Sequence, residues 1–329
     1  MEFMPELELH HPTSVEEAVT AFQATTDGRY LAGGSDMLVN IRRGIEQPDS
    51  LVYLNGVTEM HGIVDHGDSI AIGGATVLAD LAGSDLLAEH FTAVATAAGE
   101  VAGPSHREYG TLGGNLCLDT RCIYYNQSEF WRAANNYCLK YRGDICHVAP
   151  GGKKCFAAFS GDVAPALLLF DAEVELASAN NEGGGRRRIP LADLYRNDGM
   201  DHLTLEPGEL LVAAHLAKPS APISSGYAKS RVRGSIDFPL AGVAIRMAVE
   251  NGAGGKITDL RVGLTGVSPL PFLAKGLDKF IGRAADEPCL EDLRDRIRTQ
   301  AKAMKTTMTP PHYRRRVAGG LAQKLAESI

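Results

Sequence analysis

The stretch RYLAGGSDMLVNIRRG, from Arg29 to Gly44, joins a short apolar run to a loop that opens with two adjacent glycines. Two glycines let the backbone take positive φ and let a ligand approach the chain closely, and Ser35 adds a hydroxyl donor. Backbone N–H groups in such a loop can bind a phosphate. The pattern is not the G-x-G-x-x-G of a dinucleotide fold, and Gly-Gly-Ser also occurs in ordinary turns. The loop is a candidate nucleotide site, with an ordinary turn as the alternative.

A second glycine loop, GPSHREYGTLGGNLC, runs from Gly103 to Cys117. It offers a second place where backbone amides and short polar side chains can meet an anion, at Thr111, Gly113, Gly114 and Asn115. Because a strand-rich segment separates the two loops along the chain, we expect them to hold a long ligand at its two ends.

Hydrophobic patterning around the loops predicts alternating helices and strands. A capping-box pattern, in which Ser14 is followed by Glu17, predicts a helix from Ser14 to Ala24. A further helix is expected near Thr92–Val101, and alternation predicts strands at Leu51–Leu54, Ser69–Gly73, Glu173–Ala177 and, closing this part, 208–217. The segment at 181–188 is typical of an exposed turn.

The pattern changes after a plausible linker at 218–226. Three stretches, at 226–233, 240–250 and 256–267, indicate antiparallel strands, with a turn signal at Asn251–Gly252. Helices from about Leu290 to Met304 and from Pro311 to Leu325 complete the chain. We therefore place a domain boundary near residue 220, which gives domains 1–220 and 221–329.

Composition limits the class of protein. The chain has 329 residues, 44% of them hydrophobic, which is enough for a large core in two domains. No run approaches the ~20 apolar residues of a membrane span and no secretory segment is evident, so we expect a cytoplasmic protein. A net charge of −7 argues against nucleic acid as the main partner.

Cysteines are concentrated in one segment: five of the six lie between Cys117 and Cys155, and Cys289 stands alone. In a reducing compartment clustered cysteines favour metal binding or redox work over disulfides, whereas a lone cysteine is usually a small buried hydrophobe. Four thiolates suit zinc or an iron–sulfur cluster equally. Structural zinc sites usually pair their cysteines closely, and no C-x-x-C occurs here, but spacing leaves both metals open.

Four stretches together, LAGGSDML, TLGGN, GDVAPALLLFDAEVEL and YAKSRVRGSIDFPLAGVA, resemble the FAD-binding medium subunit of the molybdenum hydroxylase (xanthine dehydrogenase) family. The resemblance covers nearly the whole chain. It implies an α+β protein: a vanillyl-alcohol-oxidase-type FAD-binding domain of two α/β subdomains, followed by a small α+β domain with a three-stranded antiparallel sheet and helices. FAD is the implied cofactor, with its diphosphate on the two glycine loops.

By the same resemblance, site residues can be assigned by position. The first loop implies FAD contacts at Ala32, Gly33, Gly34, Ser35 and Asp36, and the second at Thr111, Gly113, Gly114 and Asn115. Asp162 matches an acidic residue expected near the adenosine. Lys229, with Arg231, matches a basic strand expected near the flavin. No residue is assigned a catalytic role, and His106 and His147 are read as hydrogen-bonding residues.

Most members of that family pass almost directly from the second loop to the D-x-x-P-A segment, whereas here some 40 residues intervene, at about 117–160. DTRCIYYNQSEFWRAANNYCLKYRGDICHV within it resembles the insertion of the 4-hydroxybenzoyl-CoA reductase β subunit, with the lone Trp131 sharing the pattern. The resemblance implies a [4Fe–4S] cluster on Cys122, Cys138, Cys146 and Cys155. Cys117 is left out of the ligand set. The aromatic residues of the insertion either shield the cluster or form the core of a small subdomain.

The function implied is electron transfer within a complex. Electrons would enter from a low-potential ferredoxin through the cluster, pass to FAD and leave toward a [2Fe–2S] small subunit and a molybdenum-cofactor large subunit, where the aromatic CoA thioester is reduced. Between Cys122 and Cys155 five basic residues face two acidic ones, a net +3 that could steer an acidic donor or be a solvated face. Two alternatives remain: a self-sufficient FAD-dependent oxidase or dehydrogenase, and a non-redox, zinc-stabilised interaction module.

Overall fold

The structure is a computed structural model that describes residues 4–179, 185–221, 223–250 and 254–329. Its first subdomain is a small parallel sheet in the order β1–β3–β2, formed by β1 (Glu8–His10), β2 (Gly28–Leu31) and β3 (Ser50–Tyr53). Helices α1 (Val15–Gln23) and α2 (Met37–Arg42) accompany it. The first glycine loop connects β2 to α2, so the sheet fixes where that loop begins.

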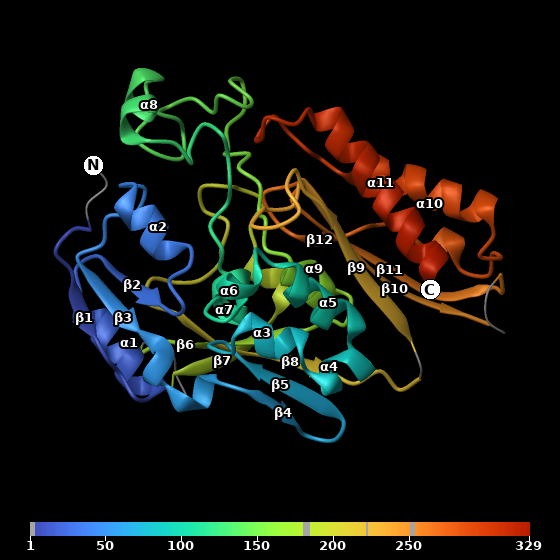
Figure 1. The fold of residues 1–329 in the computed structure, drawn as a ribbon, viewed down its shortest axis with the longest axis horizontal. Helices are drawn as coiled ribbons and strands as arrows, with labels where there is room; N and C mark the ends of the chain where they lie inside the picture. Colours follow the sequence, from blue (N-terminus) through green and yellow to red (C-terminus); the bar gives the residue numbers. More distant parts are fainter. Residues whose placement is uncertain (1–3, 180–184, 222, 251–253) are drawn as a thin grey trace.

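A second subdomain contains a five-stranded antiparallel sheet in the order β4–β5–β8–β6–β7. Its strands are β4 (Ile63–Asp65), β5 (Ser69–Gly73), β6 (Glu173–Ala177), β7 (Arg186–Pro190) and β8 (Leu210–Ala217). Helices gather over this sheet (Figure 1): α3 (Leu78–Ala82), α4 (Asp85–His90), α5 (Thr92–Glu100), α6 (Pro104–Arg107), α7 (Leu112–Leu116) and α9 (Val163–Leu168). The largest apolar core lies between the helices and the sheet. Short 3-10 turns occupy Leu54–Gly56, Thr58–Met60 and Leu191–Leu194.

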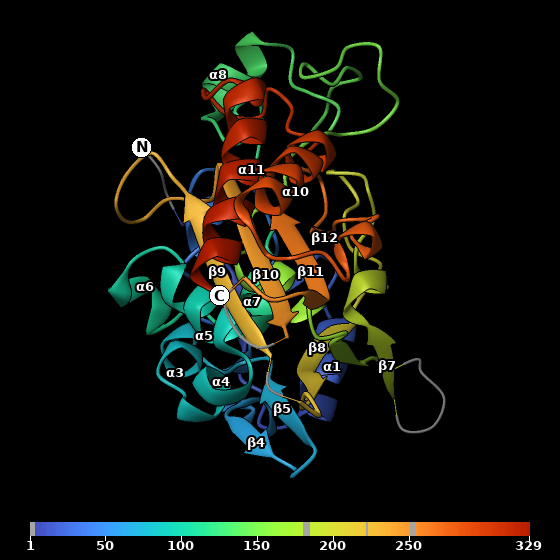
Figure 2. The ribbon, with the colours of Figure 1, turned by 90° about the vertical axis from the view of Figure 1, so that its right-hand side faces the viewer.

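The C-terminal part is a sheet in the order β12–β11–β10–β9, with β9 (Ser224–Ser230), β10 (Ala241–Val249), β11 (Ile257–Thr265) and β12 (Phe272–Leu273). A 3-10 turn at Asp278–Phe280 precedes helices α10 (Glu287–Gln300) and α11 (Pro311–Ser328), which pack on one face (Figure 2). The opposite face meets the N-terminal part of the chain, where the hydroxyl of Ser225 accepts a hydrogen bond from the Ala93 N–H of α5, 3.1 Å away.

The cysteine lobe comprises residues 117–160, and its middle part projects beyond the three sheets at the top of the molecule in Figure 1. Its one helix is α8 (Glu129–Ala134), and most of its backbone is irregular. Asn136, Tyr137 and Arg142 take positive φ, which is uncommon outside glycine. A segment held this way depends on its own side-chain contacts rather than on a sheet or helix ladder.

Most predicted elements are present, with boundaries that differ by a few residues. The strands predicted at Ser69–Gly73 and Glu173–Ala177 are β5 and β6, and the helix predicted near Thr92–Val101 is α5. The prediction of a three-stranded C-terminal sheet was wrong by one strand, because β12 pairs with β11 at Gly263 and Leu264. β12 has only two residues, which are too few to show a periodic pattern in the sequence. The helix predicted to reach Met304 ends at Gln300.

Other expectations concern turns and spans. The turn at Asn251–Gly252 and most of the turn at 181–188 lie outside the described residues, and 186–188 belong to β7. The linker predicted at 218–226 is shorter, because β9 begins at Ser224. Within the described ranges, none of the helices combines the length and hydrophobicity that a membrane crossing needs.

Candidate functional site: a cleft and an adjoining cysteine cavity

A cleft of about 520 Å³ opens between the first and second subdomains and the loop that joins β9 to β10. That volume is within the ~300–1,000 Å³ usual for cofactor pockets. Of the eleven residues predicted to contact FAD, ten line the cleft: Ala32, Gly33, Gly34, Ser35, Asp36, Thr111, Gly113, Gly114, Asn115 and Asp162. The eleventh, Lys229, does not.

The first glycine loop has a packing reason for its glycines as well as a binding one. A Cβ on Gly33 would overlap the carbonyl oxygen of Tyr109 in the second loop, and Gly34 takes φ +69°. Among the hydrogen bonds of the described residues, none has the backbone N–H of Gly33, Gly34 or Ser35 as its donor. Three N–H groups are thus left to meet an anion at the wall of the cleft.

The second loop is held by its own hydrogen bonds. The Thr111 hydroxyl accepts from the Gly114 N–H at 3.1 Å and caps α7, while a Cβ on Gly113 would lie 2.9 Å from the Gly74 carbonyl oxygen. The Asn115 side-chain oxygen accepts from the Val163 N–H at 3.0 Å, so this residue ties α7 to α9.

Because Gly33 packs against Tyr109, the two loops converge on one place. The expectation that they hold opposite ends of a long ligand was therefore wrong. The strands that separate the two loops along the sequence do not separate them in space. Unpartnered N–H groups, short polar side chains and backbone-to-backbone packing at one wall fit the diphosphate of FAD in their chemistry.

Asp162 and Lys229 meet inside the protein. The Asp162 carboxylate accepts from the Tyr227 hydroxyl at 2.6 Å and lies 3.1 Å from the Lys229 ammonium, and both charged side chains are almost fully buried. Burial raises the pKa of Asp162, which Lys229 and Tyr227 oppose. The resemblance implied separate places for them, near adenosine and near flavin, but their charged groups are in contact, because the Lys229 side chain of β9 reaches Asp162 just before α9. Arg231 instead pairs with Glu100 at 3.2 Å.

The four cysteines assigned to a cluster line one small cavity in the cysteine lobe, although 33 positions separate the first from the last. Cys122, Cys138, Cys146 and Cys155 are all buried. Burial is the main cause that raises the pKa of Cys122 to about 12 and that of Cys155 to about 11, and charges on the other thiols of the set add to it. All four cysteines therefore line one enclosed space.

The same cavity does not hold a single metal ion as it stands. Among the described residues, no three His, Cys, Asp or Glu side chains form a group that could bind one. The space enclosed is about 10 Å³, so any cluster would need the lining side chains to move apart. The residue types nevertheless suit an iron–sulfur cluster, because four buried thiols line the same cavity.

The remaining cysteines lie elsewhere. Cys117 is half-buried and lines the cleft, where burial raises the pKa of its thiol to about 12. Cys289 is buried in the core of the C-terminal domain.

Cleft and cavity share a wall, the segment from Cys117 to Cys122. Cys117, Leu118, Asp119 and Arg121 line the cleft, and Cys122 lines the cavity. Arg121 forms an ion pair with Asp36 of the first loop and lies 4.7 Å from the centroid of the Phe238 ring. Sequence patterns missed Asp119 and Arg121 as parts of this wall, and the only available signal was their position between a predicted flavin loop and a predicted ligand. Lys140, which lines the cavity, was noted only as one of the basic residues between the predicted ligands.

Aromatic residues of the lobe do not act alike. Tyr124 and Tyr125 line the cysteine cavity, whereas the Phe130 side chain is 85% exposed and neither shields the cavity nor forms a core. Trp131 lies 6.2 Å from Tyr124, ring to ring. Two histidines were expected to form hydrogen bonds. His106 lines the cleft, and His147 lines the cavity, where its ring contacts the Tyr137 carbonyl.

A glycine-walled cleft between two subdomains of sheet and helices, with a small α+β domain beside it, fits a flavoprotein subunit, and two family models match the chain. The model described as "FAD binding domain in molybdopterin dehydrogenase" matches residues 5–219, and "CO dehydrogenase flavoprotein C-terminal domain" matches 225–329. The chain therefore belongs to the family of FAD-binding medium subunits of molybdenum hydroxylases. It is an FAD-containing oxidoreductase subunit for electron transfer.

Individual relatives span nearly the same length. The carbon monoxide dehydrogenase medium chain of Afipia carboxidovorans is 28% identical over 326 residues, covering 97% of this chain and 94% of that one. The aldehyde oxidoreductase FAD-binding subunit of Escherichia coli is 30% identical over 277 residues, covering 82% and 84%.

Solved structures show the same fold. Carbon monoxide dehydrogenase from Hydrogenophaga pseudoflava matches with a TM-score of 0.78 and 24% identity, over 98% of this chain and 96% of that chain. Quinoline 2-oxidoreductase from Pseudomonas putida 86 matches with a TM-score of 0.75 and 18% identity, over 99% and 97%.

Proposed function

We propose that this chain is the FAD- and [4Fe–4S]-binding electron-transfer subunit of a molybdenum hydroxylase-family complex, and that the complex is a 4-hydroxybenzoyl-CoA reductase. The observation that carries the proposal is the convergence of Cys122, Cys138, Cys146 and Cys155 on one cavity that shares a wall with the cleft. FAD exchanges one or two electrons and a cluster exchanges one, which is the chemistry the two groups supply when bound.

A cluster accounts for the cavity better than zinc does. One zinc ion draws its thiolates to about 2.3 Å from a single centre, and no described trio of ligating residues has such an arrangement. A [4Fe–4S] cube places each thiolate on a different iron and so accepts a wider set. Four buried thiols line one cavity, and their sequence spacing lacks the close pairs usual in structural zinc sites, which favours the cluster.

The chain's own residues would hold the groups. The two glycine loops and the polar side chains beside them would bind FAD, and the four cysteines would bind the cluster. The Arg121–Asp36 ion pair joins the cysteine lobe to the first loop and so fixes one site relative to the other. The domain boundary near residue 220 and a cytoplasmic location remain part of this proposal.

Partners follow from the relatives. The subunit would assemble with a molybdenum-cofactor large subunit and a [2Fe–2S] small subunit, because its relatives are medium chains and FAD-binding subunits of larger enzymes. A ferredoxin is the proposed donor. The basic patch that would steer it is smaller than the sequence suggested: Arg132 and Lys140 are buried in ion pairs with Glu129 and Asp119, which leaves Arg142, Lys153 and Lys154 nearer the surface.

Metal and sulfide analysis tests the cluster. We expect anaerobically purified protein to carry FAD with about four iron and four sulfide per chain. Cys122→Ser should keep FAD and lose iron, whereas Cys289→Ala, a change of a buried cysteine in the other domain, should lose neither. Unchanged iron in Cys122→Ser, or one zinc and no sulfide in the unsubstituted protein, contradicts the proposal.

The substrate assignment needs the complete complex. Ferredoxin-driven loss of the phenolic hydroxyl from 4-hydroxybenzoyl-CoA by the purified complex supports it. Turnover of a small substrate by this chain alone would instead identify a self-sufficient flavin enzyme.

A further inference from the structure

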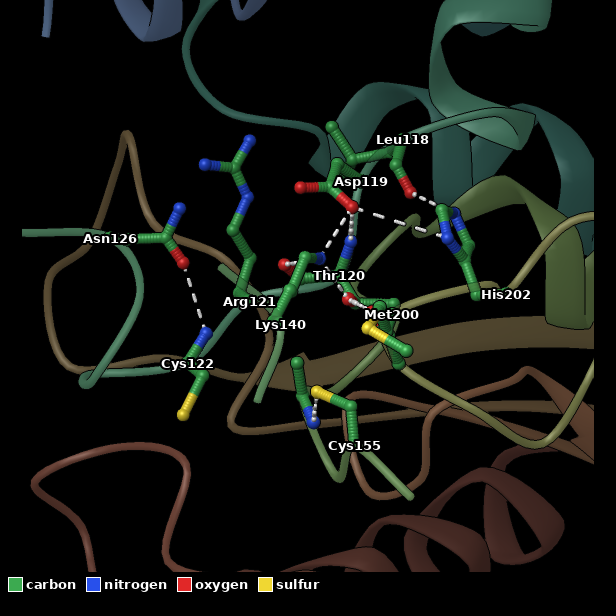
Figure 3. A network of polar contacts seen from close by, with 12 residues as sticks. Leu118, Asp119, Thr120, Arg121, Cys122, Asn126, Lys140, Cys155, Met200 and His202 are labelled. Carbon is green, nitrogen blue, oxygen red and sulfur yellow. Dashed lines mark hydrogen bonds and ion pairs between the residues drawn. The ribbon is translucent and has the colours of Figure 1, made fainter. Parts of the chain in front are cut away.

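A buried ammonium, that of Lys140, is part of the network of polar contacts drawn in Figure 3. Lys140 Nζ donates to the Asp119 carboxylate at 2.6 Å, to the Thr120 hydroxyl at 2.6 Å and to the Thr120 carbonyl at 3.1 Å. Its side chain is 6% exposed. These three acceptors use all three N–H donors of the ammonium, so the side chain has one well-defined position.

This side chain belongs to both sites. Lys140 itself lines the cysteine cavity, and its Nζ lies 4.6 Å from the ring centroid of Tyr125, which also lines that cavity. Its partner Asp119 lines the cleft. Its charge also reaches Glu46 of the cleft, where it opposes the rise in pKa that burial causes.

The segment that Lys140 holds is the shared wall, and other contacts fix it from the opposite side. Arg121 and Ala158 exchange backbone hydrogen bonds of 2.7 and 2.8 Å, which ties the chain beside Cys122 to the chain beside Cys155. The fully buried Thr120 hydroxyl donates to the Gly199 carbonyl. Asp119 and Thr120 are therefore pinned between Lys140 and the body of the protein.

We propose that Lys140 is a positioning residue for both sites: it holds the wall between them and keeps a positive charge beside the four cysteines, which makes a bound cluster easier to reduce. The inference rests on the proposed cluster. A reduced cluster carries one more negative charge than an oxidised one, and a nearby cation in a poorly solvated site favours the more negative state. Removing the charge should therefore lower the reduction potential.

Three variants separate charge from packing. Lys140→Met removes the charge and keeps an unbranched apolar stem, and Lys140→Arg keeps the charge. Lys153→Met removes an exposed lysine of the same lobe that lines neither cavity, and it serves as the matched control. Each protein is purified anaerobically with its FAD, iron and sulfide counted, and its cluster is titrated against redox mediators and followed by electron paramagnetic resonance.

We expect Lys140→Met to shift the equilibrium between reduced and oxidised cluster at least tenfold toward the oxidised form. For a one-electron couple this is a fall of about 59 mV in midpoint potential. Lys140→Arg and Lys153→Met should stay within about threefold of the unsubstituted protein, and this ordering at equal iron content supports the proposal.

Two results overturn it while leaving the cluster in place. One is a midpoint potential in fully loaded Lys140→Met equal to that of Lys153→Met. The other is an equal loss of iron from Lys140→Met and Lys140→Arg, which would mean that only the size of the lysine matters. Absence of iron and sulfide from the unsubstituted protein overturns the cluster proposal itself, and with it this inference, before any variant is compared.

Discussion

At the scale of single residues, Gly33 shows how one position serves two purposes. Its missing side chain lets the first loop pack against the Tyr109 carbonyl of the second loop, and its N–H remains without an acceptor in the described chain. Any Cβ would separate the loops before it touched a ligand. The demand for glycine here comes from loop-to-loop packing as well as from cofactor approach.

Gly33→Ala should therefore weaken FAD binding at least tenfold, about 1.4 kcal/mol, because the two loops cannot keep their contact. The flavin-to-protein absorbance ratio after dialysis, and titration of the apoprotein with FAD, measure this. Gly320→Ala is the control: nothing lies within 4 Å of the added Cβ and the position is inside α11, so it should keep FAD and stabilise the helix slightly. Equal FAD affinity in the two variants would show that the loop contact is not required.

At the scale of elements, α1 shows how a local sequence signal becomes a helix start. Ser14 is the N-cap and its hydroxyl accepts from the Glu17 N–H at 3.1 Å, as the sequence predicted. In a capping box the Glu17 carboxylate would accept from the N-cap N–H of Ser14. Here it accepts instead from the Thr13 N–H at 2.7 Å and from the Thr13 hydroxyl at 2.8 Å. These hydrogen bonds lower the pKa of Glu17.

Ser14→Ala should destabilise the protein by about 1 kcal/mol, because the Glu17 N–H loses its acceptor. Ser14→Gly should cost only a few tenths of that, since glycine leaves the N–H open to water and suits the cap backbone. Urea unfolding followed by circular dichroism compares the two. A Ser14→Ala protein as stable as the unsubstituted one would mean that the hydroxyl contributes nothing.

At the scale of the whole molecule, a buried ion pair joins the two domains. Asp162 begins α9 of the FAD-binding domain, and Lys229 and Tyr227 come from β9 of the C-terminal domain. Burying both charges is costly, and their mutual contact offsets that cost only while both are present. Relative domain placement, and with it the third side of the cleft, depends on this pair.

Lys229→Met should destabilise the protein by ~3–5 kcal/mol, because it leaves the Asp162 carboxylate buried without its cation. Since burial already raises the pKa of Asp162 above its ordinary 3.8, the folded state binds this proton more tightly than the unfolded state. The stability that Asp162 contributes is fully present below pH 3.8, and it is lost as the pH rises through the pKa of Asp162 in the folded protein.

In Lys229→Met the loss of stability with rising pH should extend to higher pH, because the lysine that opposed the rise in the pKa of Asp162 is gone. Adding Asp162→Asn should recover part of the stability and remove the added pH dependence. Equilibrium unfolding in urea across a pH series measures both. A double variant no more stable than Lys229→Met would show that the uncompensated carboxylate is not the cause.

The sequence by itself determined the family, most helices and strands, and the residues of both glycine loops, because these rest on local propensity and on short motifs within one loop. It also grouped four cysteines as one set. Only the tertiary structure decided that the loops meet at one wall, that Lys229 contacts Asp162 rather than the cleft, and that Lys140 and Asp119 stand between the two sites. Those facts depend on contacts between residues far apart in the chain, and periodicity along a single segment carries no information about which distant segment packs against it.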